Sequence, residues 1–287
     1  MSELNERIAA LSPEQRAIFD LLRKKQQKKP AAAAPPAGPI PRRPGGGPAP
    51  LSFDQERLWF LHQLDPLDPA YNIFALTRLR GRLDVARLTA AVNEVVRRHE
   101  AWRTCFPALD GRPVQAVLPH LELRPPVVDL RALPAAVRRQ AGLRIARQEK
   151  VRPFDLERGP LVRALLIHLG DEELFCQLTV HHIVSDWASF QIAWGEIAAL
   201  YAALPEVSRE GTRLLLPEPP IQYADFAVWQ REWMQGETLQ AYLDFWLREI
   251  EGAPLVLELP TDRPRPAFLT TRGAQPPVEV SFVETEA

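Results

Sequence analysis

The chain has 287 residues, enough to bury a sizeable core and, by the usual relation of length to domain number, to form about two domain-sized units. Its 35 Lys and Arg residues nearly balance 36 Asp and Glu residues, so a net charge of −1 supplies no overall field for nucleic acid or an anionic membrane. No apolar run approaches the roughly 20 residues of a membrane span, and the amino terminus is too polar for a signal peptide. We therefore expect a cytoplasmic protein that binds neither nucleic acid nor membrane.

The two cysteines, Cys105 and Cys176, each lie inside an apolar, strand-like segment. Two such residues provide neither a disulfide framework nor a Cys-rich zinc site, so both are predicted to be buried thiols. His99 and Glu100 lack the second histidine of a helical zinc motif. The sequence therefore predicts no metal site.

Two segments precede the globular part of the chain. Residues 1–29 contain a helix start, with Ser12 as N-cap, Pro13 at the first helical position and Gln15 completing a capping box. Because so short a helix is marginal alone, we expect it to dock on this chain or on a neighbouring protein. Residues 30–50 are almost wholly Pro, Ala and Gly, which predicts an extended linker; binding of this proline-rich stretch to an aromatic groove is the alternative.

From residue 51 the hydrophobic pattern alternates between helix and strand periodicity, which predicts a mixed α/β fold. Helices are expected at 53–64, 84–100, 134–151, 187–204, 223–234 and 239–252, a strand at 71–81, and hairpins at 102–118 and 161–180. The first hairpin should turn at Asp110-Gly111 and the second near Gly170-Asp171. Residues 276–284 predict a last strand without an evident partner.

The stretch VHHIVSDWAS, residues 180–189, joins the second hairpin to the helix that follows it. Adjacent residues of a strand point to opposite faces, so His181 and His182 cannot easily bind one metal ion together. We expect one ring to be inward scaffold and the other to face a cavity, where an imidazole can hold or move a proton near neutral pH. The alternative is a pair of hydrogen-bonded core histidines. Asp186 would be a carboxylate near or under the loop that needs a cation.

Five stretches together resemble the condensation domains of non-ribosomal peptide synthetases, members of the chloramphenicol-acetyltransferase-like superfamily. They are LSFDQERLWFL, RHEAWRTCF, VHHIVSDWAS, YADFAVWQREW and LELPTDRPRP, and they occur in family order. The resemblance implies a chloramphenicol-acetyltransferase-like lobe of α/β (α+β) class at 51–214, with a mixed sheet and flanking helices, and the beginning of a second lobe at 215–287. It covers a little over half of a complete family domain, so we expect the chain to be truncated.

The resemblance also implies a reaction. A carrier-bound acceptor amine attacks the thioester of a carrier-bound acyl or peptidyl donor, and His182 orients or deprotonates that amine. His181 is then scaffold, Asp186 is structural and pairs with Arg103, and Arg98 lies in the same stretch. The chain itself would bind no cofactor, because the phosphopantetheine belongs to upstream and downstream carrier domains. Neighbouring synthetase modules are further expected partners, through residues 1–29.

The sequence departs from the family pattern at two positions. Trp187 stands where the family usually has glycine, and Trp102 where it commonly has leucine. An indole at the first position adds bulk and removes easy access to positive φ, so it either reshapes the pocket or marks weakened catalysis. Ser189 and Trp229 are the other residues expected to shape the pocket.

Two other functions stay open at this point. One is an acyltransferase of the same superfamily that uses free coenzyme A, although no basic cluster evidently supplies a nucleotide pocket. The other is a catalytically inactive fragment that binds a carrier protein or docks a neighbouring module. Ring-forming members replace the two histidines with aspartates, so their presence here favours amide condensation.

Overall fold

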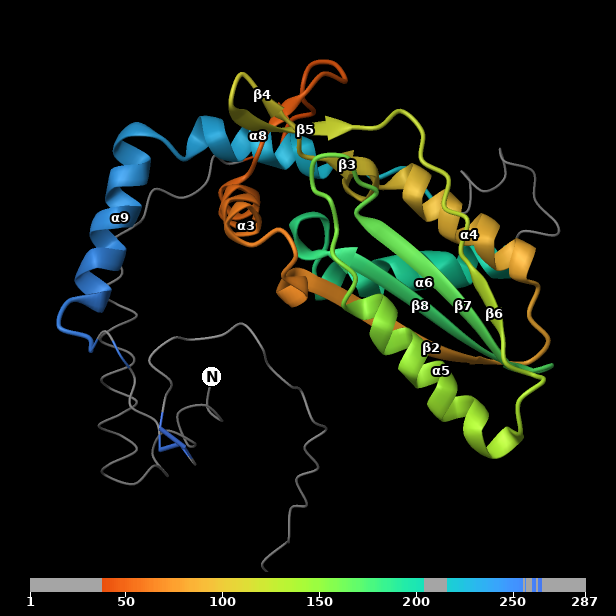
Figure 1. Ribbon diagram of the computed structural model, residues 1–287. Coiled ribbons are helices and arrows are strands. Elements are labelled where there is room, and N and C mark those ends of the chain that lie inside the picture. Colours follow the sequence, from red (N-terminus) through yellow and green to blue (C-terminus); the bar gives the residue numbers. More distant parts are fainter. Residues whose placement is uncertain (1–37, 204–215, 255, 257–259, 262, 265–287) are drawn as a thin grey trace, which may run out of the picture.

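The computed structural model describes residues 38–203 and 216–254, together with 256, 260, 261, 263 and 264 (Figure 1). The helix predicted within residues 1–29 and the strand predicted at 276–284 lie outside this part of the chain. Within it, helices and strands alternate as the hydrophobic pattern predicts, which confirms the mixed α/β class.

The main sheet has the order β2-β8-β7-β6 and carries helices on both faces. Its strands are β2 (Asn72–Arg80), β6 (Val127–Asp129), β7 (Val162–Gly170) and β8 (Glu173–His181). Neighbours are antiparallel except β6 and β7, which are parallel, so the sheet is mixed. One face is covered by α5 (Ala135–Lys150), and the other by α4 (Val85–Arg98) and α6 (Trp187–Ala203) (Figure 1).

Strand alternation divides the core into two layers. In β7, Val162, Ala164 and Leu166 point into the larger layer, under α4 and α6, whereas Leu165 and Ile167 point toward α5. Strand β8 is buried on both faces along nearly its whole length, as expected for a central strand covered on both sides. Both cysteines are buried and free, as predicted, and burial raises the pKa of Cys176 to about 12.

A smaller sheet forms around β5 (Arg112–Val117), which pairs with β1 (Ala49–Pro50), β3 (Thr104–Cys105) and β4 (Ala108–Leu109). The predicted turn between β4 and β5 is confirmed, since Asp110 and Gly111 both have positive φ, 51° and 75°. Two successive positive φ values are the signature of a tight hairpin turn that matches strand twist. The pattern gave no sign of β1 or β6, which are only two and three residues long.

Six further helical segments complete the described part of the chain. They are α3 (Phe53–Leu64), η1 (Pro69–Tyr71), η2 (Glu100–Arg103), η3 (His182–Val184), α8 (Tyr223–Trp233) and α9 (Gly236–Ile250). Helix α8 packs against β1 and η2, and α9 then extends away from the lobe (Figure 1). Among the residues that the structure describes, none of α9 is buried, and its Leu243, Trp246, Leu247 and Ile250 are largely exposed.

The last part of the predicted linker belongs to the folded body. The Arg43 guanidinium, only 10% exposed, forms ion pairs with Glu100 (2.7 Å) and with Asp225 (2.9 Å), and Asp225 is itself 4% exposed. Arg42 donates to the carbonyl oxygens of Pro219 and Pro220. The predicted linker boundary at residue 50 is therefore wrong. Arg42, Arg43 and the pairing of β1 with β5 already attach the chain to the lobe between residues 42 and 50.

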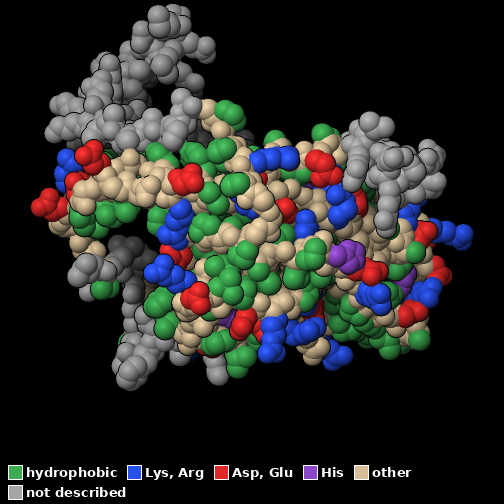
Figure 2. Space-filling model, turned by 90° about the horizontal axis from the view of Figure 1, so that it is seen from above, with side chains coloured by type: hydrophobic (Ala, Val, Ile, Leu, Met, Phe, Trp, Pro, Cys, Tyr) green, Lys and Arg blue, Asp and Glu red, His purple; other side chains and the backbone are tan. Residues whose placement is uncertain are grey.

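Charges elsewhere on the surface are mixed. Figure 2 shows Lys and Arg side chains interspersed with Asp and Glu around a central group of hydrophobic side chains. Such a surface supplies no single-sign field on that face, in keeping with the net charge of −1.

Replacement of Arg43 tests whether this anchor is part of the fold. Arg43→Ala leaves the Asp225 carboxylate buried without its cation, so we expect the free energy of unfolding to fall by about 3 kcal/mol. The matched control is Arg42→Ala, which removes an exposed arginine and should lower stability by less than about 1 kcal/mol. Urea unfolding of the two variants makes the comparison, and equal small losses would contradict the anchor.

Candidate active site

The paired histidines lie where β8 leaves the sheet. Strand pairing continues to the last residue of β8, with His181 opposite Asn72 of β2, and the His181 amide donates to the carbonyl oxygen of Leu161 (3.0 Å). The next residue, His182, opens the turn η3. His181 is 3% exposed, so the predicted inward ring is confirmed. His182 is exposed, but it is not among the residues that line the pocket described below, so its expected position facing a cavity stays a prediction.

The His181 ring fills the inner side of the turn. Its Nδ1 accepts a hydrogen bond from the amide of Ile183 (3.1 Å), and the rings of His62, Tyr71 and Phe154 surround it at centroid distances of 6.0 to 6.4 Å. Burial, with smaller contributions from His62 and His182, lowers the pKa of His181 to about 3. The ring is therefore neutral near pH 7, with its proton on Nε2, because Nδ1 acts as the acceptor.

The His182 ring is oriented by its own turn. Its Nδ1 lies 2.8 Å from the carbonyl oxygen of Ser185, and the Ser185 amide closes the turn on the His182 carbonyl (3.4 Å). A carbonyl oxygen can only accept, so Nδ1 carries a proton. In the neutral ring Nε2 is then left as a proton acceptor on the exposed side of the loop.

Asp186 caps the helix that follows the turn. One of its carboxylate oxygens accepts from both the amide (2.7 Å) and the hydroxyl (2.6 Å) of Ser189, in the first turn of α6. These hydrogen bonds, the one from the hydroxyl above all, lower the pKa of Asp186. The carboxylate is exposed and lies at the positive end of the helix, where a negative charge is favourable.

The predicted ion pair between Asp186 and Arg103 is wrong. The Arg103 guanidinium donates to the backbone carbonyls of Leu118 and Arg97, and Asp186 finds its donors in Ser189. The expectation assumed a buried carboxylate that needs a cation. Because Asp186 stays in water and accepts hydrogen bonds from the helix start, it needs none.

Arg98 has a different carboxylate partner, which the sequence did not indicate. Arg98 is 4% exposed and holds both oxygens of Glu196 (3.1 and 3.2 Å), and it also donates to the carbonyls of Leu216 and Pro217. His99 contacts the same carboxylate through Nε2 (2.8 Å). Glu196 is the one charged residue of the apolar helix α6, and that isolation is the signal that could have found it.

A small pocket of about 100 Å³ lies between the second and third stretches of the resemblance. Its lining residues are His99, Ala101, Trp102, Val184, Ser189, Ile192 and Ala193. Of the residues predicted to shape a pocket, Ser189 lines this one, whereas Trp187 and Trp229 do not. Trp187 is instead 66% exposed and packs on Phe190, and Trp229 stacks on Trp233 along α8 at 5.2 Å between ring centroids.

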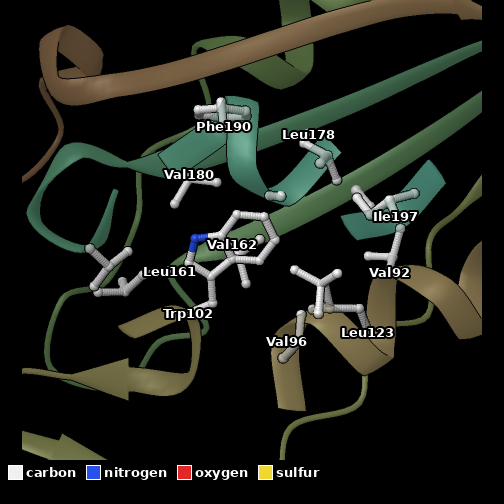
Figure 3. Packing of buried hydrophobic residues seen from close by; sticks show 14 of the residues in the cluster. Val92, Val96, Trp102, Leu123, Leu161, Val162, Leu178, Val180, Phe190 and Ile197 are labelled. Carbon is white, nitrogen blue, oxygen red and sulfur yellow. The ribbon is translucent and has the colours of Figure 1, made fainter. Parts of the chain in front are cut away.

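Trp102, the other departure from the family pattern, is part of the core. Its indole is 3% exposed and lies among Leu161, Val162 and Val96 (Figure 3). The larger ring therefore fills space under α4 and β7, and it also forms part of the pocket wall.

The described residues contain no helix long and apolar enough to cross a membrane. They also contain no group of three or more His, Cys, Asp or Glu side chains placed to hold a metal ion.

Comparison with known proteins identifies the family. The Condensation domain model matches residues 47–286, and the chain belongs to the condensation domain family. It is 46% identical over 278 residues to phosphinothricin tripeptide synthetase PhsC of Streptomyces viridochromogenes, a match that covers 96% of this chain and 25% of PhsC. It is also 41% identical over 251 residues to malpibaldin synthetase of Mortierella alpina, covering 86% of this chain and 4% of that synthetase.

Solved structures agree on the fold. The X-domain from teicoplanin biosynthesis superposes with a TM-score of 0.65 at 28% identity, over 80% of this chain and 49% of that one. The first condensation domain of the CDA synthetase gives 0.64 at 22% identity, over 76% and 53% of the two chains, which supports the fold alone. The fold is thus chloramphenicol-acetyltransferase-like. The chain spans about half the length of these solved structures and a quarter or less of the two synthetases.

The hydrogen bonds of Glu196 with Arg98 and His99 predict that the stability of the fold depends on pH. Burial opposes ionisation of Glu196, but hydrogen bonds with His99 and Arg98 outweigh it and lower the pKa to about 2, from an ordinary 4.5. A carboxyl whose pKa falls on folding stabilises the fold above its unfolded pKa, and that contribution is lost as the pH falls from about 4.5 toward 2. We expect Glu196→Gln to remove about 2 kcal/mol of stability at pH 7 and much less at pH 3.

Urea unfolding at several pH values measures this effect. Glu122→Gln, at an exposed glutamate, is the control and should follow the parent protein at every pH. A stability difference for Glu196→Gln that does not change with pH would contradict the assigned hydrogen bonds.

Proposed function

We propose that this chain supplies the first lobe of a condensation domain that forms amide bonds, with His182 as the catalytic residue. The observation that carries the proposal is the geometry of the His182 ring. Nδ1 is engaged by the Ser185 carbonyl, Nε2 is left to accept, and the side chain is exposed next to the start of α6. Relatives of the chain, such as phosphinothricin tripeptide synthetase PhsC, are peptide synthetases by name, which fits this chemistry.

In the proposed reaction an acceptor amine attacks the carbonyl carbon of a donor thioester. A C–N bond forms and the C–S bond breaks, and the proton lost by the amine ends on the departing thiolate. Nε2 of His182 accepts a hydrogen bond or the proton from the amine as it attacks. Both substrates are carried on the phosphopantetheine of partner carrier domains, upstream and downstream, so the chain itself holds no cofactor.

The neighbouring residues act through His182. His181 is a neutral scaffold that pins the Ile183 amide, and Asp186 with Ser189 fixes the start of α6. Arg98 is a structural residue that joins α4 to α6 through Glu196. Arg103 is structural as well, because it donates to the backbone carbonyls of Leu118 and Arg97.

We further propose that residues 215–287 begin a second lobe and that residues 1–29 dock a neighbouring synthetase module. The exposed apolar residues of α9 support the second lobe, since such a face is stable only when it is covered. The reacting ends of the two substrates would meet at His182 between the lobes.

Replacement of His182 tests the function. His182→Ala should lower the rate of amide formation between carrier-bound substrates by roughly 10² to 10⁴, the usual worth of a well-placed acid-base group. The rate is measured by single turnover in the complete synthetase that carries this sequence. His120→Ala, which removes another exposed histidine, is the control and should keep the parent rate. A His182→Ala protein with the parent rate would overturn the proposal.

Trp187 is proposed to select substrates beside His182. The indole contributes little to the core, at 66% exposed, and it stands in the first turn of α6, directly after the His182 loop. Trp187→Gly should change the ratio of kcat/KM between small and bulky carrier-bound substrates by about tenfold or more, because pocket contacts of this size discriminate at that level. Trp187→Phe should retain most of the preference. An unchanged substrate profile in Trp187→Gly would contradict this role.

A further inference from the structure

The loop that carries His182 is also held by a buried amide from the beginning of the lobe. Gln55 lies in the first turn of α3 and is 2% exposed, and Gln115 of β5 is 1% exposed. The two side chains meet, with Gln55 Nε2 donating to Gln115 Oε1 (3.3 Å). A buried carboxamide costs free energy unless its polar atoms form hydrogen bonds, so loss of either glutamine would leave polar atoms of the other without a partner.

The hydrogen bonds of the Gln55 side chain fix the orientation of its carboxamide. Its Oε1 accepts from the amide of Ser52 (3.0 Å), and its Nε2 donates to the carbonyl oxygen of Ile183 (3.2 Å). A backbone amide only donates and a carbonyl only accepts, so these two partners determine which end of the carboxamide is which. The hydrogen-bond network extends further, because Gln115 donates to the carbonyl oxygen of Pro50 (2.7 Å). The network thus joins β1, β5, α3 and η3.

Ile183 is the residue directly after His182, and both of its backbone polar groups are engaged from outside the turn. Its amide donates to Nδ1 of His181, and its carbonyl accepts from Gln55. The turn is therefore held at Ile183 by two elements: β8 holds the amide of this residue, and α3 holds its carbonyl. Within the turn, the bond between His182 and Ser185 then sets the ring.

We propose that Gln55 is a positioning residue for His182: its amide fixes the Ile183 carbonyl, and thereby the direction in which His182 Nε2 faces. This role rests on the proposed function of His182. It explains why the side chain is a carboxamide, since a carboxylate cannot donate to Ile183 and a hydrocarbon can neither accept from Ser52 nor donate.

The ¹⁵N NMR signals of the histidine rings report which ring nitrogen carries the proton. Loss of a residue that only stabilises the fold should leave the His182 signals unchanged. The chain has six histidines, so the His182 signals can be assigned by comparison with His182→Gln. In the parent protein we expect the neutral His182 ring to be held as the Nδ1–H form. In Gln55→Glu and Gln55→Leu the turn is released at Ile183, so the His182 signals should move toward the average of the two tautomers.

The same variants should lower kcat of the complete synthetase by roughly 10²-fold with little change in KM, the effect expected of a misplaced catalytic group. Gln55→Glu keeps the acceptor for Ser52 and loses the Nε2 donor for Ile183 and Gln115. A spectral change in Gln55→Leu but not in Gln55→Glu would assign the effect to the helix cap and overturn the proposal.

Gln177 provides a matched control. It is a buried glutamine in β8, 0% exposed, and it donates to the carbonyl of Ala146 and to the Thr179 hydroxyl (both 3.1 Å), on the side of the sheet that faces α5. Gln177→Leu should destabilise the fold while leaving the His182 signals in place. If it moves those signals as far as Gln55→Leu does, the effect is general loosening and the proposal fails.

A measurement on the unaltered chain keeps the proposal testable if the variants do not fold. The Nε2 protons of Gln55 should exchange with solvent far more slowly than those of the exposed Gln140, and equal rates would overturn the proposed bond to Ile183. The two proposals are separable. A His182→Ala protein that keeps the parent rate contradicts the catalytic role alone, whereas unmoved His182 signals in both Gln55 variants contradict only the positioning role.

Discussion

The site depends on the register of β8. This strand pairs with β2 on one side and β7 on the other, and its side chains are buried on both faces. A shift of one residue would exchange the two faces and turn every buried side chain around, so the hydrophobic layers hold the register firmly. That register places His181 inward at the last pair of the sheet and leaves His182 to begin the turn outside it. The outward ring is thus a consequence of core packing several residues away.

Around this strand end, side chains from distant parts of the sequence hold the same loop. Gln55 reaches the Ile183 carbonyl from α3, and Tyr223 of α8 contacts Ser52, the cap of α3, with 3.0 Å between hydroxyl oxygens. Arg43 ties the other side of α8 to η2. The first four stretches of the resemblance therefore meet as one hydrogen-bonded frame, in which polar side chains join the elements and the loop supplies the exposed imidazole.

The sequence predicted most of the described helices and strands and the inward position of one histidine of the pair, because both follow from local periodicity. Helix caps, the turn at Asp110-Gly111 and strand alternation all act within a few residues. It did not predict which partner a charged or amide side chain would choose. Asp186 selected Ser189 over Arg103, and Arg98 selected Glu196, since those choices depend on how α4 and α6 cross and on whether the carboxylate is in water. The roles of Arg43 and Gln55 were missed for the same reason, as their partners are more than 50 residues away.

The two tryptophans that depart from the family pattern show how burial separates packing from function. Trp102 is buried in the core, where neighbouring side chains accommodate its extra volume, and it also lines the small pocket. Trp187 is mostly exposed, and removal of its indole would take little from the hydrophobic core. Its ring stands in the turn of helix that follows the proposed catalytic loop, with most of its surface exposed. A tryptophan is therefore part of the core at one position and, by our proposal, selects substrates at the other.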